Sequence, residues 1–339
     1  MTQTFDYSLQ LVAAVLLAIG VTANGLGAVR AQEQSKPKAP DAEVKAAAAI
    51  SSAPDLAAKL TQAEAFVKKY PKSSLRPQVV QGLTAEISRV TDAAQRLNLE
   101  ERFLKTFPND AESGYMKALL VDDYVNAKRV DEAFTLGATT LAKQPENLGV
   151  LSTLALAGTE EARKQNSKYT TQALQYGEKA IGMIESKKKP ADMDDTYWTF
   201  QQSLLPKLYL SMGALALAGG KAAEARPRLE KAIQLSPTEP TAYIFLGGLI
   251  DDEYRAVAES YQLMKEGPEK QATLKKATEL MDGVIDLYAR GLGAAAGKPE
   301  YKTLYDQVLE SITPYYRYRY KSTTGLQPLV DKYKTPAQP

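Results

Sequence analysis

The sequence predicts an all-α fold built from consecutive helical hairpins, and three observations support this prediction. Apolar residues recur at intervals of three and four, as they do on one face of a helix. Helix-ending prolines recur at Pro71, Pro108 and Pro145, with an equal spacing of 37 residues. No segment alternates apolar and polar residues over six or more positions in the manner of a strand.

The equal spacing of the prolines belongs to an internal repeat. The segment AEAFVKKYPKSS at 63–74 aligns with EERFLKTFPNDA at 100–111, pairing Phe66 with Phe103 and Tyr70 with Phe107. A repeat of this period is typical of helical arrays, in which each unit buries its apolar face only against its neighbours.

The clearest unit is PKLYLSMGALALAGGKAAEARPRLEKAIQLSPTE at 206–239. Its periodic positions are Tyr209, Met212, Gly213, Gly220, Ala225, Leu229, Ala232 and Pro237. This stretch closely resembles the tetratricopeptide repeat (TPR), matching the small residue of the first helix, the two alanines of the second helix and the closing proline.

Each of these positions has a physical reason. Gly213 and Ala225 are small enough to let the two helices of the hairpin approach closely. Gly219 and Gly220 can adopt the positive backbone angles of the turn between the helices. Pro237 cannot continue a helix, so the chain is expected to reverse into the next unit.

Looser copies flank this unit at 114–147, 148–189 and 240–290. The predicted fold is a TPR-like α-solenoid of about five to six hairpins with a C-terminal capping helix. Residues 193–219 are expected to form one long helix kinked at Pro206. The expected helix N-caps are Asp55, Asp92, Asp131, Ser167 and Thr238.

The predicted domain order is a signal peptide or anchor at 1–31, a linker at 32–40, repeats at 41–298, a cap at 299–334 and a tail at 335–339. An array needs such a cap because its last hairpin otherwise exposes an apolar face. A helical stripe suited to capping is formed by Tyr305, Leu309, Ile312, Tyr316 and Tyr320. Pro314 is expected to kink this helix.

The N-terminal segment has the layout of a secretory signal peptide. The apolar run LVAAVLLAIGV at 11–21 precedes Val29-Arg30-Ala31, which offers small residues for cleavage after Ala31. The stretch before the run carries Asp6 and no Lys or Arg, unlike the usual positive start of a signal peptide. An uncleaved anchor at 9–29 and a mis-assigned start codon are therefore alternatives. Export to the periplasm or cell envelope is expected.

Composition excludes several classes of function. With 42 Lys and Arg against 40 Asp and Glu, the formal charge of +2 gives no electrostatic footprint for nucleic acid. The absence of Cys removes disulfides and thiol nucleophiles, and the absence of His removes the commonest general base and metal ligand. We expect no cofactor, no metal and no enzyme activity.

The resemblance to TPR proteins implies that a protein or peptide partner binds in a groove lined by the first helix of each hairpin. Carried over by position, the groove residues are Tyr115, Asp122, Asn126, Lys207, Leu210, Leu217, Thr241, Ile244 and Asp251. This lining is largely apolar or small, with a few acids. It lacks the repeated Lys, Asn and Arg with which some family members clamp a C-terminal carboxylate.

The run Tyr315-Tyr316-Arg317-Tyr318-Arg319-Tyr320 allows two interpretations. Tyr315, Arg317, Tyr318 and Arg319 could form a secondary aromatic and cationic surface for a peptide, glycan or lipid headgroup. The other interpretation places Tyr316 and Tyr320 in the seam of the cap, with the arginines in solvent.

Two further motifs have structural interpretations. Gly291-Leu292-Gly293-Ala294-Ala295-Ala296 fits part of a dinucleotide fingerprint, but no strand precedes it, so a helix–helix loop is expected. Asp192, Asp194 and Asp195 suggest the beginning of a calcium loop that Thr196 and Tyr197 do not continue; an acidic helix start is expected instead.

Three functions remain. The first is a non-catalytic protein- or peptide-binding scaffold or adaptor of the bacterial cell envelope. The second is an envelope assembly factor anchored in the membrane by residues 9–29. The third is a hydrolase of cell-wall glycan, which would need paired carboxylates.

Overall fold

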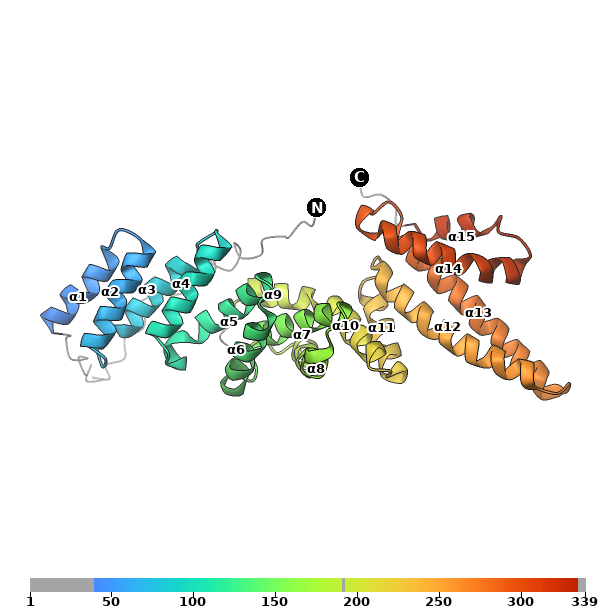
Figure 1. The fold of residues 1–339 in the computed structure, drawn as a ribbon, viewed down its shortest axis with the longest axis horizontal. Coiled ribbons are helices and arrows are strands. Elements are labelled where there is room, and N and C mark those ends of the chain that lie inside the picture. The colour runs from blue at the N-terminus through green and yellow to red at the C-terminus, as the bar shows by residue number, and fades with distance from the viewer. Residues whose placement is uncertain (1–39, 191–192, 335–339) are drawn as a thin grey trace, which may run out of the picture. The chain divides into compact units, whose positions relative to one another are not determined.

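The computed structural model describes residues 40–190 and 193–334, which form fifteen α-helices, two 3-10 turns and no strand. The predicted all-α class is therefore confirmed (Figure 1). In chain order the helices are α1 Asp41–Ser51, α2 Leu56–Lys69, α3 Arg76–Ile87, α4 Ala93–Thr106, α5 Asp110–Asn126, α6 Val130–Lys143, α7 Leu148–Arg163, α8 Thr170–Glu185, α9 Asp195–Ser203, α10 Leu205–Ala218, α11 Ala222–Leu235, α12 Pro240–Leu263, α13 Pro268–Ala295, α14 Lys302–Tyr320 and α15 Leu326–Lys332. The 3-10 turns are Ser167–Tyr169 and Pro299–Tyr301.

Most of the helices alternate as first and second helices of hairpins. The first helices are α1, α3, α5, α7, α10 and α12, and the second helices are α2, α4, α6, α8, α11 and α13. The chain divides into two compact units. Unit 1 contains the described residues up to 157 together with 188–190 and 193–201, and unit 2 contains 158–187 and 202–334.

Unit 1 repeats the same packing from one hairpin to the next. The second helices α2 and α4 pack against each other, and α4 packs against α5, which in turn packs against α6. Phe66 and Tyr70 bring their ring centroids to 5.6 Å, and Phe103 and Phe107 repeat this pair at 4.9 Å. These are the residues that the 37-residue repeat aligns.

Prolines end the second helices as the repeat predicts. Pro71, Pro108, Pro145 and Pro237 each follow a residue that closes a helix. All four closing residues share one backbone conformation, with φ between −122° and −139° and ψ between 63° and 79°. The proline ring disfavours the helical region for the residue before it, so each of these four helices stops at the same place in its unit.

The turn between first and second helices also repeats. The residues at positive φ are Lys128 at 60°, Gln165 at 66° and Gly220 at 71°. In each turn the next amide donates to a carbonyl five residues earlier, for example Lys221 N to Ala216 O at 2.8 Å. This is a Schellman ending of the first helix. Of the Gly219–Gly220 pair, only Gly220 has positive φ, because Gly219 closes the helix at φ −84°.

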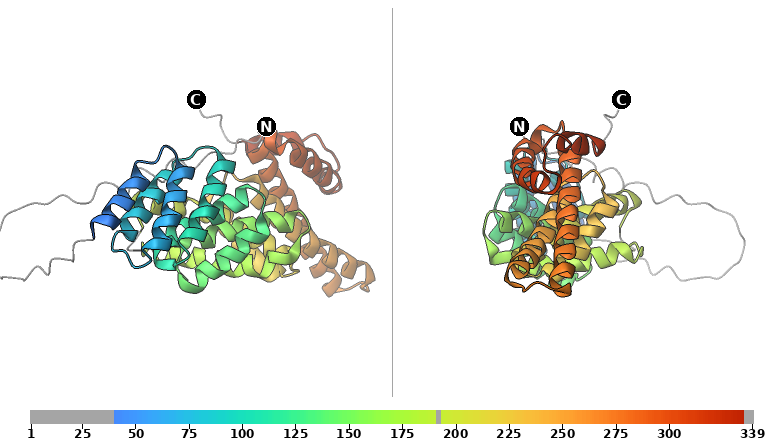
Figure 2. Two further views of the ribbon diagram at one scale, coloured as in Figure 1. Left: turned by 60° about the vertical axis from the view of Figure 1, so that its left-hand side comes forward. Right: turned by 90° about the vertical axis from the view of Figure 1, so that its right-hand side faces the viewer.

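Unit 2 contains the α10–α11 hairpin, whose sequence has the closest TPR resemblance. An added Cβ at Gly213 of α10 would lie 2.7 Å from Leu229 Cδ2 of α11, so the glycine allows the close approach expected from the sequence. The next hairpin is longer, because α12 has 24 residues and α13 has 28. These two helices run side by side (Figures 1 and 2), and their length explains why the small residues of α13 come late in the sequence.

The last two helices cover the end of unit 2. Both α14 and α15 pack against α13, where Ile312 and Val330 are fully buried. Gly293 leaves room for this contact, because an added Cβ would lie 2.6 Å from the Tyr333 backbone. The expected loop at 291–296 is therefore wrong: residues 291–295 form the buried end of α13.

Several expected helix boundaries also need correction. Asp55 and Asp92 cap α2 and α4 as expected. Asp131 instead lies in the first turn of α6, where a carboxylate interacts favourably with the helix dipole. Ser167 and Thr238 are replaced as caps by their neighbours Asn166 and Glu239.

The expected long helix at 193–219 is two helices. α9 and α10 separate at Leu204, and Pro206 lies in the first turn of α10, where a proline loses no helical hydrogen bond. None of the helices in the described ranges is both long and apolar enough to cross a membrane. The predicted signal or anchor at 1–31 and the tail at 335–339 lie outside the described residues.

Candidate functional site

A polar face on the first helices α5 and α7 is the best candidate for a binding site. We define the α5–α7 face by Tyr115, Asp122, Gly149, Ser152 and Thr153. Tyr115 and Asp122 are seven residues apart on α5, so they lie on one side of that helix. Gly149, Ser152 and Thr153 lie within about one turn of α7, at spacings of three and four, and share one side of it. The Thr153 hydroxyl donates a hydrogen bond to the Asp122 carboxylate and joins the two helices.

The short helix α9 lies on this face. The Ser152 hydroxyl is 2.9 Å from the Gln201 amide oxygen, and both residues are almost completely buried. The Tyr197 hydroxyl lies so close to Gly149 that a Cβ added to this glycine would overlap it. The start of α9 is capped by Asp194, whose side chain accepts from the Tyr197 amide at 2.8 Å.

Burial sets the protonation of the groups on the face. It raises the pKa of Asp122 to about 6, although the hydrogen bond from Thr153 opposes this shift. Burial, and then the charge on Asp122, raise the pKa of Tyr197, so its phenol stays protonated at neutral pH. Partial burial, followed by nearby carboxyl groups that include Asp122, also raises the pKa of Tyr115. The face therefore offers neutral hydroxyl groups beside one carboxyl that titrates near neutrality.

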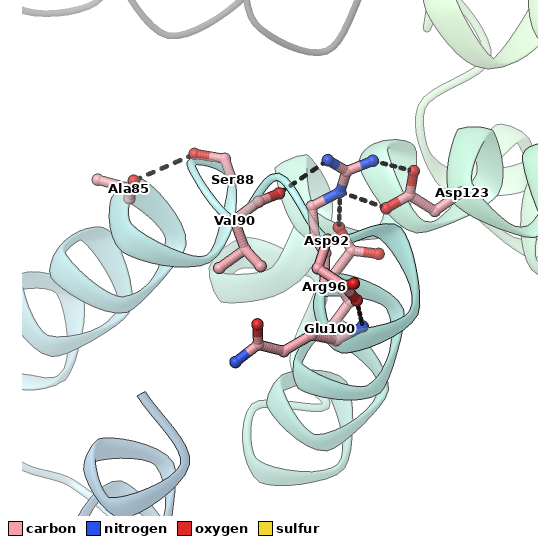
Figure 3. Close-up of polar contacts among 8 residues, drawn as sticks. Ala85, Ser88, Val90, Asp92, Arg96, Glu100 and Asp123 are labelled. Atoms are coloured by element: carbon pink, nitrogen blue, oxygen red, sulfur yellow. Dashed lines mark hydrogen bonds and ion pairs between the residues drawn. The ribbon is translucent and has the colours of Figure 1, made fainter. Parts of the chain in front are cut away.

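A buried ion pair joins α4 and α5. Its acidic member is Asp123, the residue that follows Asp122 in the sequence. Arg96 donates two hydrogen bonds to Asp123, each 2.6 Å long, and a third to the Val90 carbonyl at 3.0 Å (Figure 3). Both Arg96 and Asp123 are almost fully buried. A bidentate pair of this kind fixes the relative position of the two helices that carry it.

Glu100 lies one helical turn after Arg96 and is completely buried. Within the described part of the chain, neither of its carboxyl oxygens has a hydrogen-bond partner, and Arg96 Nε is 3.9 Å away. Burial and then the charge on Asp123 raise the pKa of Glu100 to about 9, so it is a neutral acid at pH 7.

The groups on the α5–α7 face can bind a partner. Asp122, Thr153 and Ser152 offer hydrogen-bonding groups, and Gly149 leaves room for a ring. Among residues 40–190 and 193–334, no group of three or more acidic side chains is placed to hold a metal ion. Two hollows elsewhere in unit 1, one bordered by α1 and α3 and one by α5 and α6, contain none of the residues that define the α5–α7 face.

The structure brings some of the predicted groove residues together and separates others. Tyr115 and Asp122 lie on the α5–α7 face, and Asn126 is the exposed last residue of α5. On α10, Lys207 is exposed, whereas Leu210 and Leu217 are half-buried against the core of unit 2.

On α12 the predicted groove residues face other helices. Ile244 packs against α13, where an added Cβ at Gly291 would lie 2.9 Å from its side chain. Asp251 is buried, accepts from the Tyr315 hydroxyl and pairs with Arg255 at 2.6 Å. Thr241 lies in the first turn, where its amide donates to Glu239 at 3.0 Å.

The Tyr/Arg run divides between packing and exposure. Tyr315 joins Asp251 and meets the Tyr254 ring edge-on at 5.5 Å, and Arg319 pairs with Asp282 at 2.7 Å. Both residues therefore hold the cap in unit 2. Tyr318 is 67% exposed and Arg317 is exposed as well, so these two remain on the surface.

The sequence interpretation missed the partners of Asp122 and the whole contribution of α9. Two signals were present. Arg96 and Glu100 fall on the apolar stripe of their helix with Leu99 and Phe103, which is unusual for charged residues. The segment 193–204 is also extra chain between two complete hairpins, since the unit at 148–189 has already ended.

The chain matches no protein-family model and no curated protein. Two solved structures that match are TTC0263, a thermophilic TPR protein of Thermus thermophilus, and pilF of Pseudomonas aeruginosa. The first is 20% identical, covers 69% of this chain and 99% of that chain, and has a TM-score of 0.36. The second is 16% identical, covers 76% of this chain and 96% of that chain, and has a TM-score of 0.35. Nothing about function follows from likeness at this level.

The class of protein follows from the hairpins themselves. The repeated Schellman turns, the prolines that close α2, α4, α6 and α11, and the Gly213–Leu229 contact are the features that match the TPR resemblance of the sequence. The chain is a TPR-like helical-repeat protein.

Proposed function

We propose that the chain is a non-catalytic protein- or peptide-binding scaffold of the bacterial cell envelope, and that its partner binds on the faces of the first helices. One observation carries the proposal. The α5–α7 face already holds a short helical segment, α9, through a buried hydrogen bond and a fitted tyrosine. A surface that binds a helix within the chain has the chemistry to bind one from a partner.

The envelope location rests on the predicted signal at 1–31. N-terminal sequencing of the mature protein separates the two envelope hypotheses. A start at Gln32 excludes the membrane-anchored assembly factor, and a chain that retains 9–29 favours it.

Site-directed photo-crosslinking tests the partner site. A crosslinking amino acid is placed at Asn126 and at Lys207, which are exposed on first helices, and at Thr139 and Glu230, which are exposed on second helices. We expect intermolecular adducts from the first pair and none from the second. Adducts only from Thr139 or Glu230, or none from any position, would contradict the proposal.

A further inference from the structure

The helix α9 does not belong to the alternating series of first and second helices. In unit 2, α8 packs directly against α10, which follows α9 in the chain. In unit 1, Tyr197 and Gln201 of α9 lie on the α5–α7 face. α8 is therefore followed by α10 in the packing of unit 2, and α9 packs on the α5–α7 face instead of joining a hairpin.

Most side chains of α9 are only partly buried or exposed. Of its nine residues, all of them described, Gln201 alone is buried. Tyr197 and Phe200 are half-buried and stack at 6.0 Å, and Gln202 and Ser203 are exposed. A helix without a fully buried apolar side chain opens locally more easily than the helices beneath it, which contribute several to the core.

The contacts of α9 define what the face selects. Gly149 lacks the Cβ that would displace a phenol, so the surface next to it accepts an aromatic ring with a hydroxyl at its end. One helical turn further along, the Ser152 hydroxyl donates to an amide oxygen that is shielded from water. Tyr197 and Gln201 meet both requirements because they are four residues apart on one side of α9.

We propose that α9 is a displaceable occupant of the α5–α7 face, and that the partner binds there with a short helix carrying a tyrosine and, four residues later, a glutamine or asparagine. This inference rests on the proposed function and names the ligand class of the same site. The wild-type chain then competes with its own partner, and binding requires α9 to leave.

A peptide of residues 193–204 supplies the probe, since it carries both anchoring side chains in their native spacing. Its binding to the full chain is measured by fluorescence anisotropy. We expect it to bind the double variant Tyr197→Ala/Gln201→Ala at least tenfold more tightly than the wild type, because the face is then free. Gln202→Ala is the matched control: it makes the same change at an exposed neighbour and should bind like the wild type. The same peptide with alanine in place of its tyrosine should lose binding.

A second variant releases α9 from the opposite side of the contact. Gly149→Ala places a Cβ against the Tyr197 hydroxyl while favouring the helical conformation of α7, so the hairpin stays folded. Trp198, the only tryptophan of the chain, lies on α9 and reports its release through quenching by acrylamide. We expect stronger quenching in Gly149→Ala. In Gly149→Ala/Tyr197→Phe we expect the wild-type value, because the hydroxyl is gone and the nearest ring carbon lies 3.4 Å from the added methyl group.

Two results would overturn the inference. One is equal affinity of the peptide, or none, for the wild type and the double variant. The other is Trp198 quenching that Gly149→Ala leaves unchanged. The crosslinking experiment can fail without the peptide experiment failing. Peptide binding to the double variant, together with no adduct from Asn126 or Lys207, would support the displacement of α9 and contradict the proposed function.

Discussion

At the scale of single residues, Glu100 gives unit 1 a carboxyl group that folding keeps protonated. Its pKa is raised from the usual 4.5 to about 9, so the folded protein holds a proton that the unfolded chain releases. Because the pKa is higher in the folded state, the free energy of unfolding decreases as pH rises. The stabilising effect is complete below pH 4.5 and is lost as pH rises towards 9, by about 1.4 kcal/mol per pH unit for a single group.

Glu100→Gln removes this linkage, since an amide has no proton to release. Between pH 5 and pH 8 we expect the wild type to lose about 4 kcal/mol of unfolding free energy relative to the variant. Urea denaturation followed by circular dichroism at both pH values measures the difference. Glu146→Gln, the same substitution at an exposed site, is the control. Parallel pH profiles for wild type and Glu100→Gln would show that Glu100 ionises normally.

Arg96 has the opposite role, since it neutralises a charge that stays buried. Arg96→Met leaves Asp123 without its partner, and we expect a loss of about 3–5 kcal/mol of unfolding free energy. Arg102→Met removes a pair with Glu64 that lies 3.0 Å away at the surface, so it should change stability by about 1 kcal/mol or less. Equal effects of the two substitutions in chemical denaturation would contradict the buried role of Arg96.

At the scale of elements, the hairpins depend on a few small residues. Gly213→Ala would place a methyl group 2.7 Å from Leu229 Cδ2 inside the α10–α11 contact. Overpacking of this kind should destabilise the protein by about 1–3 kcal/mol. At Gly182 of α8 no described atom lies within 4 Å of an added Cβ, so Gly182→Ala should stabilise by about 0.5–1 kcal/mol through helix propensity. Thermal unfolding gives the sign of each change, and the same sign for both would contradict the assigned role of Gly213.

The sequence allowed prediction of the elements whose signals are local. Pro71, Pro108 and Pro145 stop their helices through the backbone of the preceding residue, so their effect can be read without the fold. The turns between first and second helices were harder to find. At Gly220 the glycine indicates a positive φ, but Lys128 and Gln165 adopt the same positive φ without being glycine. Pro206 was misread as a kink because a proline inside a helix and one in its first turn look alike in sequence.

At the scale of the whole molecule, the order of hairpins and the C-terminal cap follow from periodicity. The position of α9 does not, because Ser152 and Gln201 are 49 residues apart and their hydrogen bond exists only once the hairpins have stacked. The predicted groove residues Ile244 and Asp251 were assigned by position in the repeat. The long α13 and the cap place groups against them that the repeat pattern does not contain.

Native-state hydrogen exchange tests the central claim most directly, because it compares the opening of α9 with that of the helices beneath it. We expect the amides of 197–203 to exchange through a local opening that denaturant hardly affects, while α5 and α7 stay protected until unit 1 unfolds. If the amides of α9 lose protection only together with those of α5 and α7, the helix is a fixed part of unit 1 and the face beneath it is not a binding site.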